Sequence, residues 1–232
     1  MSTIVTICAR GGSKGLPRKN VLPFAGIPLI AHSIRQALAC PSIDGVYVST
    51  DDDEAAEIAR EYGAQVPYRR PGDLASDEAA KIPAIEHLVQ HLEAQGLKIS
   101  TVVDLQPTSP LRLPSDIVEA LTHTNTSELV VSVTEPAHNP YYSLVEVQQD
   151  GSLALSKAAG YARRQDAPVV WGLNGAIYVW QREALAKAAA RGFWSVRSLP
   201  YVMPRHRSVD IDDILDFEIA EWLFRRQEQV SL

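Results

Sequence analysis

The residues with the clearest chemical potential lie in one short stretch near the start of the chain, residues 9–20 (ARGGSKGLPRKN). Its three glycines allow the backbone to turn sharply and to approach a ligand closely. Cationic side chains accompany them at Arg10, Lys14, Arg18 and Lys19. The preceding residues, 3–8, are a β-branched apolar run that predicts a buried strand. A cationic, glycine-rich loop at the end of a first strand predicts a cradle for an anion such as a polyphosphate.

Other motifs compete for the same residues. Residues 11–15 satisfy the G-x-S-x-G pattern of a serine hydrolase with Ser13 as nucleophile, but that turn needs a helix directly after the serine. Pro17 and Pro23 instead favour an extended loop. The phosphate-binding pattern ending in Gly-Lys-Ser/Thr is absent, and the dinucleotide pattern G-x-G-x-x-G fails on spacing. An exposed basic turn is the simplest alternative.

A second group of candidate residues lies near the end of the chain, where residues 208–213 read SVDIDD. In a strand, Asp210 and Asp212 would share one face while the apolar residues around them enter the core. Two hard oxygen donors on one face suit Mg²⁺, whose coordination is then completed by substrate phosphates and water. Helix capping is the alternative, and Asp213 and Asp216 fit it better. We therefore predict a metal site at Asp210 and Asp212.

The composition bounds the class of protein. A chain of 232 residues with 46% apolar and 22% charged residues is ordinary for one soluble domain. Its net charge of -6 argues against general binding to nucleic acid or to an anionic membrane, so the cationic loop predicts a small anion in a pocket. Cys8 and Cys40 are too few for a disulfide framework or a zinc site. Without a recognisable signal peptide or membrane span, the expected location is the cytoplasm.

The order of the predicted elements indicates an α/β fold. Strands are expected at residues 3–8, 45–50, 64–68, 101–106, 128–134, 175–180 and 199–203. Helices are expected at 28–39, 51–62 and 78–95, from 114, after 180 and from 213. This alternation is typical of a mostly parallel sheet with flanking helices. The pattern weakens at about 135–170, so we expect a single domain, 1–232, with an inserted arm whose aromatic side chains form a partner surface.

Taken together, the separate motifs resemble those of one known family. They are ARGGSKG at 9–15 with KN at 19–20, QPTSP at 106–110, RRQ at 163–165, NG at 174–175 and SVDID at 208–212. Their order and spread over nearly the whole chain are similar to those of the CMP-sialic acid synthetases (acylneuraminate cytidylyltransferases). The resemblance implies a Rossmann-like nucleotide-diphospho-sugar transferase fold, Mg²⁺ dependence and a homodimer whose arm reaches the partner's site.

The resemblance also implies roles for individual residues. Contacts with CTP are expected from Arg10, Gly11, Gly12, Ser13, Lys14, Asn20, Arg70 and Asp77. Contacts with the sugar acid are expected from Gln106, Thr108, Ser109, Arg164 and Asn174. Catalytic roles are expected for Lys14, Lys19, Arg164 and Asp212. Taken alone, Asn174 and Gly175 would also fit a hairpin turn.

The implied reaction is transfer of CMP from CTP to the 2-hydroxyl of a nonulosonic (sialic-type) acid, with release of pyrophosphate. Mg²⁺ and the loop cations would neutralise the phosphate charge. Ala79, Lys81 and Gly172 depart from residues common in the family, so legionaminic, pseudaminic and deoxyoctulosonic acids are alternative acceptors. A serine hydrolase using Ser13 and a non-catalytic nucleotide-binding protein are rival functions, and the aspartate pair favours an enzyme.

Overall fold

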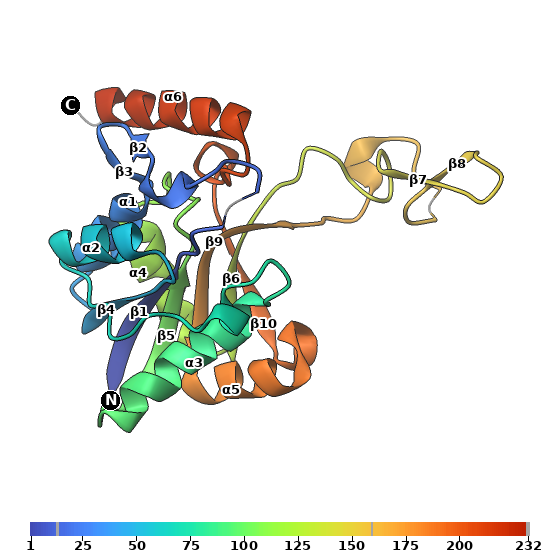
Figure 1. Cartoon of the computed structure of the whole chain (residues 1–232). Coiled ribbons are helices and arrows are strands. Elements are labelled where there is room, and N and C mark those ends of the chain that lie inside the picture. The colour runs from blue at the N-terminus through green and yellow to red at the C-terminus, as the bar shows by residue number, and fades with distance from the viewer. Residues whose placement is uncertain (13, 159, 231–232) are drawn as a thin grey trace.

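The computed structural model describes residues 1–12, 14–158 and 160–230, and its centre is a six-stranded sheet (Figure 1). The strand order is β10-β6-β9-β5-β1-β4. The strands are β1 (Ser2–Cys8), β4 (Gly45–Ser49), β5 (Ile99–Leu105), β6 (Leu129–Thr134), β9 (Gly172–Gln181) and β10 (Ser198–Val202). Only β9 runs antiparallel to its neighbours, β5 and β6, while the other pairs are parallel. The expected mainly parallel α/β sheet is confirmed.

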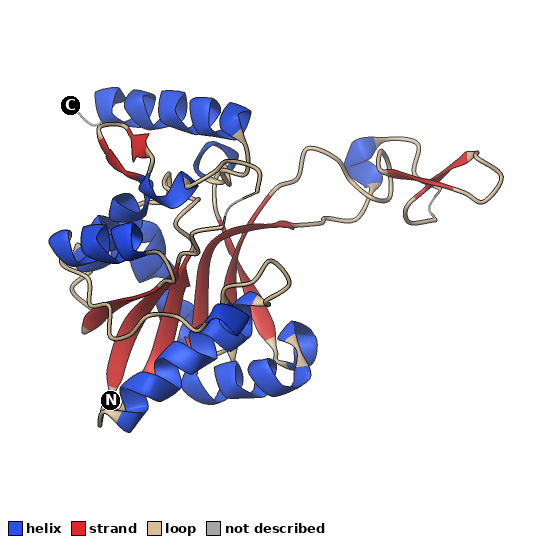
Figure 2. Ribbon diagram, in the orientation of Figure 1, coloured by secondary structure: helices blue, strands red, loops and turns tan. Residues whose placement is uncertain are grey.

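Helices cover both faces of the sheet (Figure 2). They are α1 (Leu29–Leu38), α2 (Asp53–Glu61), α3 (Lys81–Ala94), α4 (Pro114–Thr122), α5 (Arg182–Arg191) and α6 (Ile214–Val230). One core cluster joins the sheet to α1, α2 and α4, and a second joins it to α3 and α5. The strands are apolar on both sides because each side is buried, as Val5 and Ile4 on opposite faces of β1 illustrate. Outside these layers, α6 packs over a small ribbon of β2 (Pro23–Phe24) and β3 (Ile27–Pro28).

Acidic caps explain where two helices begin. The Asp52 carboxylate accepts hydrogen bonds from the backbone N–H groups of Glu54 and Ala55 at the start of α2. Before α6, the backbone N–H of Asp216 donates to Asp213, and that of Asp213 donates back to Asp216. The predicted capping role of Asp213 and Asp216 is confirmed, because these carboxylates satisfy first-turn N–H groups that lack helical partners.

Two expected strands and one expected alternative, a hairpin turn, are wrong. Residues 64–68 form no regular strand; an isolated bridge joins Gln65 to Tyr47 in β4, and a second joins the following residue, Arg69, to Thr50. Pro67 lacks the N–H that a continuous ladder would need. Residues 208–213 form a loop instead of a strand, and the Ile211 N–H is bonded to the Thr108 carbonyl in the turn after β5 instead of to a strand. The pair Asn174–Gly175 lies inside β9, so the hairpin alternative is also wrong.

Residues 135–171 form an arm that projects away from the sheet between β6 and β9 (Figure 1). It carries a short ribbon of β7 (Val145–Val147) and β8 (Leu153–Leu155). Val147, Leu153 and Val169 on this arm are at least two-thirds exposed, at 73%, 67% and 78%. The arm therefore leaves these apolar side chains uncovered within one chain. Among the described residues, the helices are too short or too polar to cross a membrane.

Candidate active site

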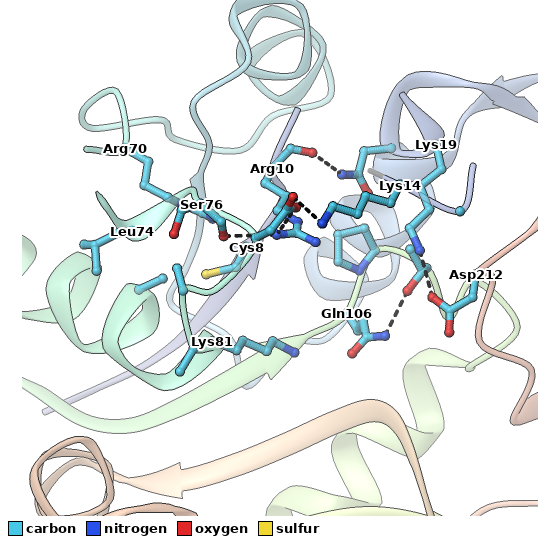
Figure 3. Close-up of a pocket in the computed structure, with 18 residues that line it drawn as sticks. Cys8, Arg10, Lys14, Lys19, Arg70, Leu74, Ser76, Lys81, Gln106 and Asp212 are labelled. Carbon is cyan, nitrogen blue, oxygen red and sulfur yellow. Dashed lines mark hydrogen bonds and ion pairs between the residues drawn. The ribbon is translucent and has the colours of Figure 1, made fainter. Parts of the chain in front are cut away.

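A cavity of about 490 Å³ lies where β1 and β5 end (Figure 3). Parallel strands present their carboxyl ends at one edge of a sheet, so loops that are distant in sequence meet there. Nine of the predicted site residues line it: Arg10, Lys14, Lys19, Asn20, Arg70, Asp77, Gln106, Thr108 and Asp212. The cavity therefore brings together the cationic loop, the turn after β5 and one aspartate of the 208–213 loop.

A carboxylate occupies the middle of the cationic cradle. Asp77 lies 3.0 Å from Arg10 Nη1 and 2.8 Å from Lys14 Nζ. The hydrogen bond from Lys14 and the charges of Lys14 and Arg10 hold the pKa of Asp77 below its ordinary value. Within this chain, Asp77 therefore neutralises both cations of the loop.

The glycine-rich loop is held against the 208–213 loop. Lys19 Nζ donates to the Ile211 carbonyl at 2.7 Å and lies 3.0 Å from an Asp212 carboxylate oxygen. A Cβ at Gly15 would collide with the Asp212 carbonyl, so only glycine permits this approach. From the other side, Asn20 Nδ2 donates to the Arg10 carbonyl at 3.1 Å. Lys19 and Asn20 thus shape the loop in addition to facing the cavity.

The first glycines of the loop have different surroundings. The backbone N–H of Gly11 donates to Asp51 at 3.1 Å, so it is already satisfied without a ligand. Nothing lies within 4 Å of a Cβ built on Gly12. Ser13, the hydrolase candidate and an expected CTP contact, lies outside the described residues.

The two aspartates of the predicted metal site differ in exposure. Asp210 is half-buried, and its carboxylate accepts hydrogen bonds from Gln106 Nε2 at 2.7 Å and from Thr108 Oγ1. Burial and the nearby charge of Asp212 raise the pKa of Asp210, against the lowering effect of the hydrogen bonds. Asp212 is exposed, with 78% of its side chain accessible, while Ile211 between them is buried in the core.

Asn174 and Ser109, two residues expected to contact the sugar acid, are buried in this chain. Asn174 is only 5% exposed; it accepts a hydrogen bond from Ser132 at 2.6 Å and donates to Ser208 Oγ at 2.9 Å. Ser109 is fully buried beside the turn after β5. Asn174 therefore supports the start of the 208–213 loop, and neither residue lines the cavity.

Arg164 lies in a different place from the other predicted residues. It lines a separate cavity of about 540 Å³ at the base of the arm, with Glu135 and Trp171. Its guanidinium is 3.5 Å from Glu135 and 3.4 Å from the Pro136 carbonyl, and 55% of its side chain is exposed. Within one chain, Arg164 does not face the cavity that holds Lys19 and Gln106.

Comparison with known proteins decides the family. A family model described as cytidylyltransferase matches residues 4–174. The chain belongs to the cytidylyltransferase family. It is 36% identical to the CMP-N,N'-diacetyllegionaminic acid synthase of Campylobacter jejuni, over 95% of this chain and 94% of that one. It is 33% identical to the N-acylneuraminate cytidylyltransferase of Escherichia coli, over 94% of this chain and 51% of that protein.

The fold agrees with this assignment. A solved CMP:2-keto-3-deoxy-manno-octonic acid synthetase in complex with CTP superposes with a TM-score of 0.70, covering 98% of this chain and all of that one. At 17% sequence identity this likeness concerns the fold alone. The expected family, nucleotidyltransferase fold and enzyme class are therefore confirmed.

Among the residues of this cytidylyltransferase that line the cavity but were not predicted as site residues, Lys81 and Cys8 have ionisable side chains. Lys81 Nζ lies 2.6 Å from Asp104, which is fully buried in β5. Burial opposes the charge of Lys81, but the Asp104 carboxylate outweighs it and raises the pKa of the lysine. In the sequence Lys81 stands out only as a departure from the family, because its partner lies 23 positions later.

Cys8 also reaches the cavity, from the end of β1. Burial raises the pKa of its thiol to about 11, so the thiolate is scarce at neutral pH. Cys8 is therefore unsuited to act as a nucleophile, as expected of a small apolar strand residue.

Proposed function

We propose that this enzyme transfers CMP from CTP to the anomeric 2-hydroxyl of a nonulosonic acid and releases pyrophosphate. The observation that carries the proposal is the junction of the cationic loop with the 208–213 loop through Lys19. Phosphoryl transfer depends mostly on positioning and on neutralising charge, and this junction concentrates cations and carboxylates at one point. The names of the relatives support an acylated nonulosonic acid as the acceptor class.

The triphosphate of CTP would bind where Asp77 now pairs with Arg10 and Lys14. These two side chains and the loop N–H groups would hold the phosphate oxygens, and Asp77 would be displaced. The Arg70 guanidinium is bonded to Ser49. Arg70 would therefore line the nucleotide site as a fixed side chain. The proposed location is the cytoplasm, which the use of CTP as a substrate supports.

Asp210 and Asp212 are the residues that would hold Mg²⁺. The described residues contain no group of three or more acidic, histidine or cysteine side chains that could enclose a metal alone. Asp210 and Asp212 lie two positions apart on one loop, and such a pair of carboxylates fits an ion whose remaining ligands come from phosphate and water. When bound, Mg²⁺ would neutralise charge on the phosphates and on the departing pyrophosphate.

The acceptor carries a carboxylate beside its reacting carbon, and its site needs a cation. A bidentate arginine suits a planar carboxylate better than a lysine. The loop cations are committed to phosphate, whereas Arg164 is exposed on the arm and held only by long contacts. We therefore assign the acceptor carboxylate to Arg164 of a second subunit, whose arm reaches across a homodimer.

The test is pyrophosphate release from CTP with a panel of sugar acids: N-acetylneuraminic, diacetyllegionaminic, pseudaminic and deoxyoctulosonic acid. We expect release that requires both CTP and one of the three nonulosonic acids, with little release from UTP, ATP or GTP. Release without any acceptor, or release only with deoxyoctulosonic acid, would contradict the proposed acceptor class.

A further inference from the structure

Arg112 is a fully buried arginine that the proposed reaction leaves unused. It ends the stretch QPTSPLR after β5 and is 1% exposed. In the described part of the chain, no carboxylate lies within ion-pair distance of its guanidinium. Burial lowers the pKa of Arg112 to about 9. Burying a cation without a carboxylate partner costs free energy of folding. We therefore ask what else the Arg112 guanidinium does.

The guanidinium joins three elements behind the cavity. Nη1 donates to the Ala176 carbonyl in β9 at 2.9 Å, and Nη2 donates to the Gln106 carbonyl at 2.9 Å. Nη2 also donates to Ser33 Oγ on α1. The planar fork of arginine can reach all three acceptors at once, whereas a single ammonium cannot.

Gln106, one of these three partners, leads directly to the predicted metal ligand. Its side-chain amide donates to Asp210 at 2.7 Å and to Thr108 Oγ1 at 2.9 Å. Thr108 donates to the other oxygen of Asp210, and its carbonyl accepts the Ile211 N–H at 2.9 Å. The turn held by Arg112 is therefore the part of the protein that orients Asp210.

The second carbonyl bonded to Arg112, that of Ala176, belongs to β9, the strand that lies against the Gln106 side chain. Gly175, with φ +72°, lies beside the Gln106 side chain, and a Cβ there would be 2.8 Å from Gln106 Oε1. Arg112 therefore fixes the backbone of Gln106 and also the strand that limits where the Gln106 amide can lie. A small shift of the Gln106 backbone or of β9 would misplace the Gln106 amide that orients Asp210.

We propose that Arg112 is a positioning residue that orients Asp210 through Gln106 and Thr108. The inference rests on the proposed function, because it takes Asp210 as part of the reaction centre. The competing interpretation is that Arg112 contributes only to stability, as Arg182 does where it joins Glu86 and Glu93 between α3 and α5.

Arg182 provides the matched control, since it is also largely buried but does not line the cavity. We would compare Arg112→Lys with Arg182→Lys, each of which keeps the charge and removes the fork. Both variants are expected to lower the melting temperature. Only Arg112→Lys is expected to lower kcat at least tenfold and to raise the Mg²⁺ concentration for half-maximal activity at least threefold.

Hydrogen–deuterium exchange gives a second readout that needs neither CTP nor metal. The Ser109 and Ile211 amides are bonded to the Gln106 and Thr108 carbonyls, so peptides over 106–111 and 208–213 should exchange faster in Arg112→Lys. Arg182→Lys should leave both peptides unchanged. If wild-type enzyme fails to use any nonulosonic acid, the proposed function fails while this comparison still tests the path from Arg112 to Asp210.

Ser33→Ala is the milder variant and decides the question if Arg112→Lys does not fold. It removes one acceptor of the guanidinium and a long hydrogen bond of 3.4 Å from Ser33 Oγ to the Gln106 carbonyl, while the bonds from Arg112 to Gln106 and Ala176 remain. We expect faster exchange at 208–213 with a twofold to threefold loss of kcat. Unchanged exchange at 208–213 in a folded Arg112→Lys, or in Ser33→Ala when the arginine variant is unfolded, would overturn the proposal.

Discussion

The cavity and the arm hold their charged residues in opposite ways. In the cavity, Lys19 bonds to a carbonyl 192 residues later and to the adjacent aspartate. In the arm, Arg163 pairs with Asp166 three residues away, and Arg164 makes only long contacts with Glu135 and the Pro136 carbonyl at the base of the arm. Long-range contacts between partly buried groups fix side chains, whereas exposed local pairs contribute little. The cavity is therefore organised within one chain, and we propose that a second subunit completes the surroundings of the arm.

The largest expected effect comes from breaking the cavity at Asp212. Asp212→Asn removes a charge from the proposed metal site and weakens its pair with Lys19, but the exposed side chain serves no core. We expect kcat to fall at least a hundredfold, about 2.7 kcal/mol of transition-state stabilisation, with an almost unchanged melting temperature. Asp213→Asn is the control and should stay active, because asparagine also caps a helix. Wild-type kinetics for Asp212→Asn at saturating Mg²⁺ would remove the residue from the mechanism.

A smaller effect is expected from the arm. Arg164→Ala should lower kcat/KM for the sugar acid at least tenfold, about 1.4 kcal/mol, with little change in KM for CTP. Arg163→Ala is the matched control, because Arg163 is the next residue in the chain and its guanidinium already pairs with Asp166. Equal losses in both variants would indicate a general effect on the arm instead of a specific contact.

Asp77→Asn should improve nucleotide binding. It removes the carboxylate that competes with phosphate for Arg10 and Lys14, so we expect a few-fold lower Kd for CTP by calorimetry at low salt. The lowered pKa keeps Asp77 ionised into the acid range, so the advantage of the variant should persist as pH falls and vanish only below that pKa. Asp73→Asn on the same loop should bind CTP as the wild type does.

The smallest effect concerns Cys8, which should stay unmodified although it lines the cavity. With its pKa raised to about 11, only about a thousandth of the thiol is ionised at pH 8. Iodoacetamide should therefore label Cys8 far more slowly than a free cysteine, with a rate that climbs as pH approaches 11. Rapid labelling at pH 7 would contradict the described surroundings of this thiol.

Local patterns in the sequence predict the parts of the molecule that local physics determines. The apolar run before Arg10 forms β1, and Asp213 and Asp216 cap α6, since each depends on residues within a few positions. The strand expected at 64–68 fails for a local reason that can be read in the sequence, the missing N–H of Pro67.

Long-range partners in the site could not be predicted. The pairing of Arg10 with Asp77 and the burial of Arg112 behind Gln106 depend on how loops meet at the sheet edge. Asp210 and Asp212 were expected to share one strand face, yet a loop gives them different exposures. Hydrophobic periodicity predicts single helices and strands. It contains no information about which charged side chains meet at the edge of the folded sheet.

The most direct test of whether the cavity and the arm of different subunits form one site is the activity recovered after mixing two impaired variants. Subunits with Arg164→Ala keep an intact cavity, and subunits with Asp212→Asn keep an intact arm. If the arm completes the partner's cavity, each heterodimer contains one whole site, and an equal mixture should recover about one quarter of wild-type activity. Native mass spectrometry would verify that heterodimers have formed. No recovery in a mixture that contains heterodimers would contradict a site shared between subunits.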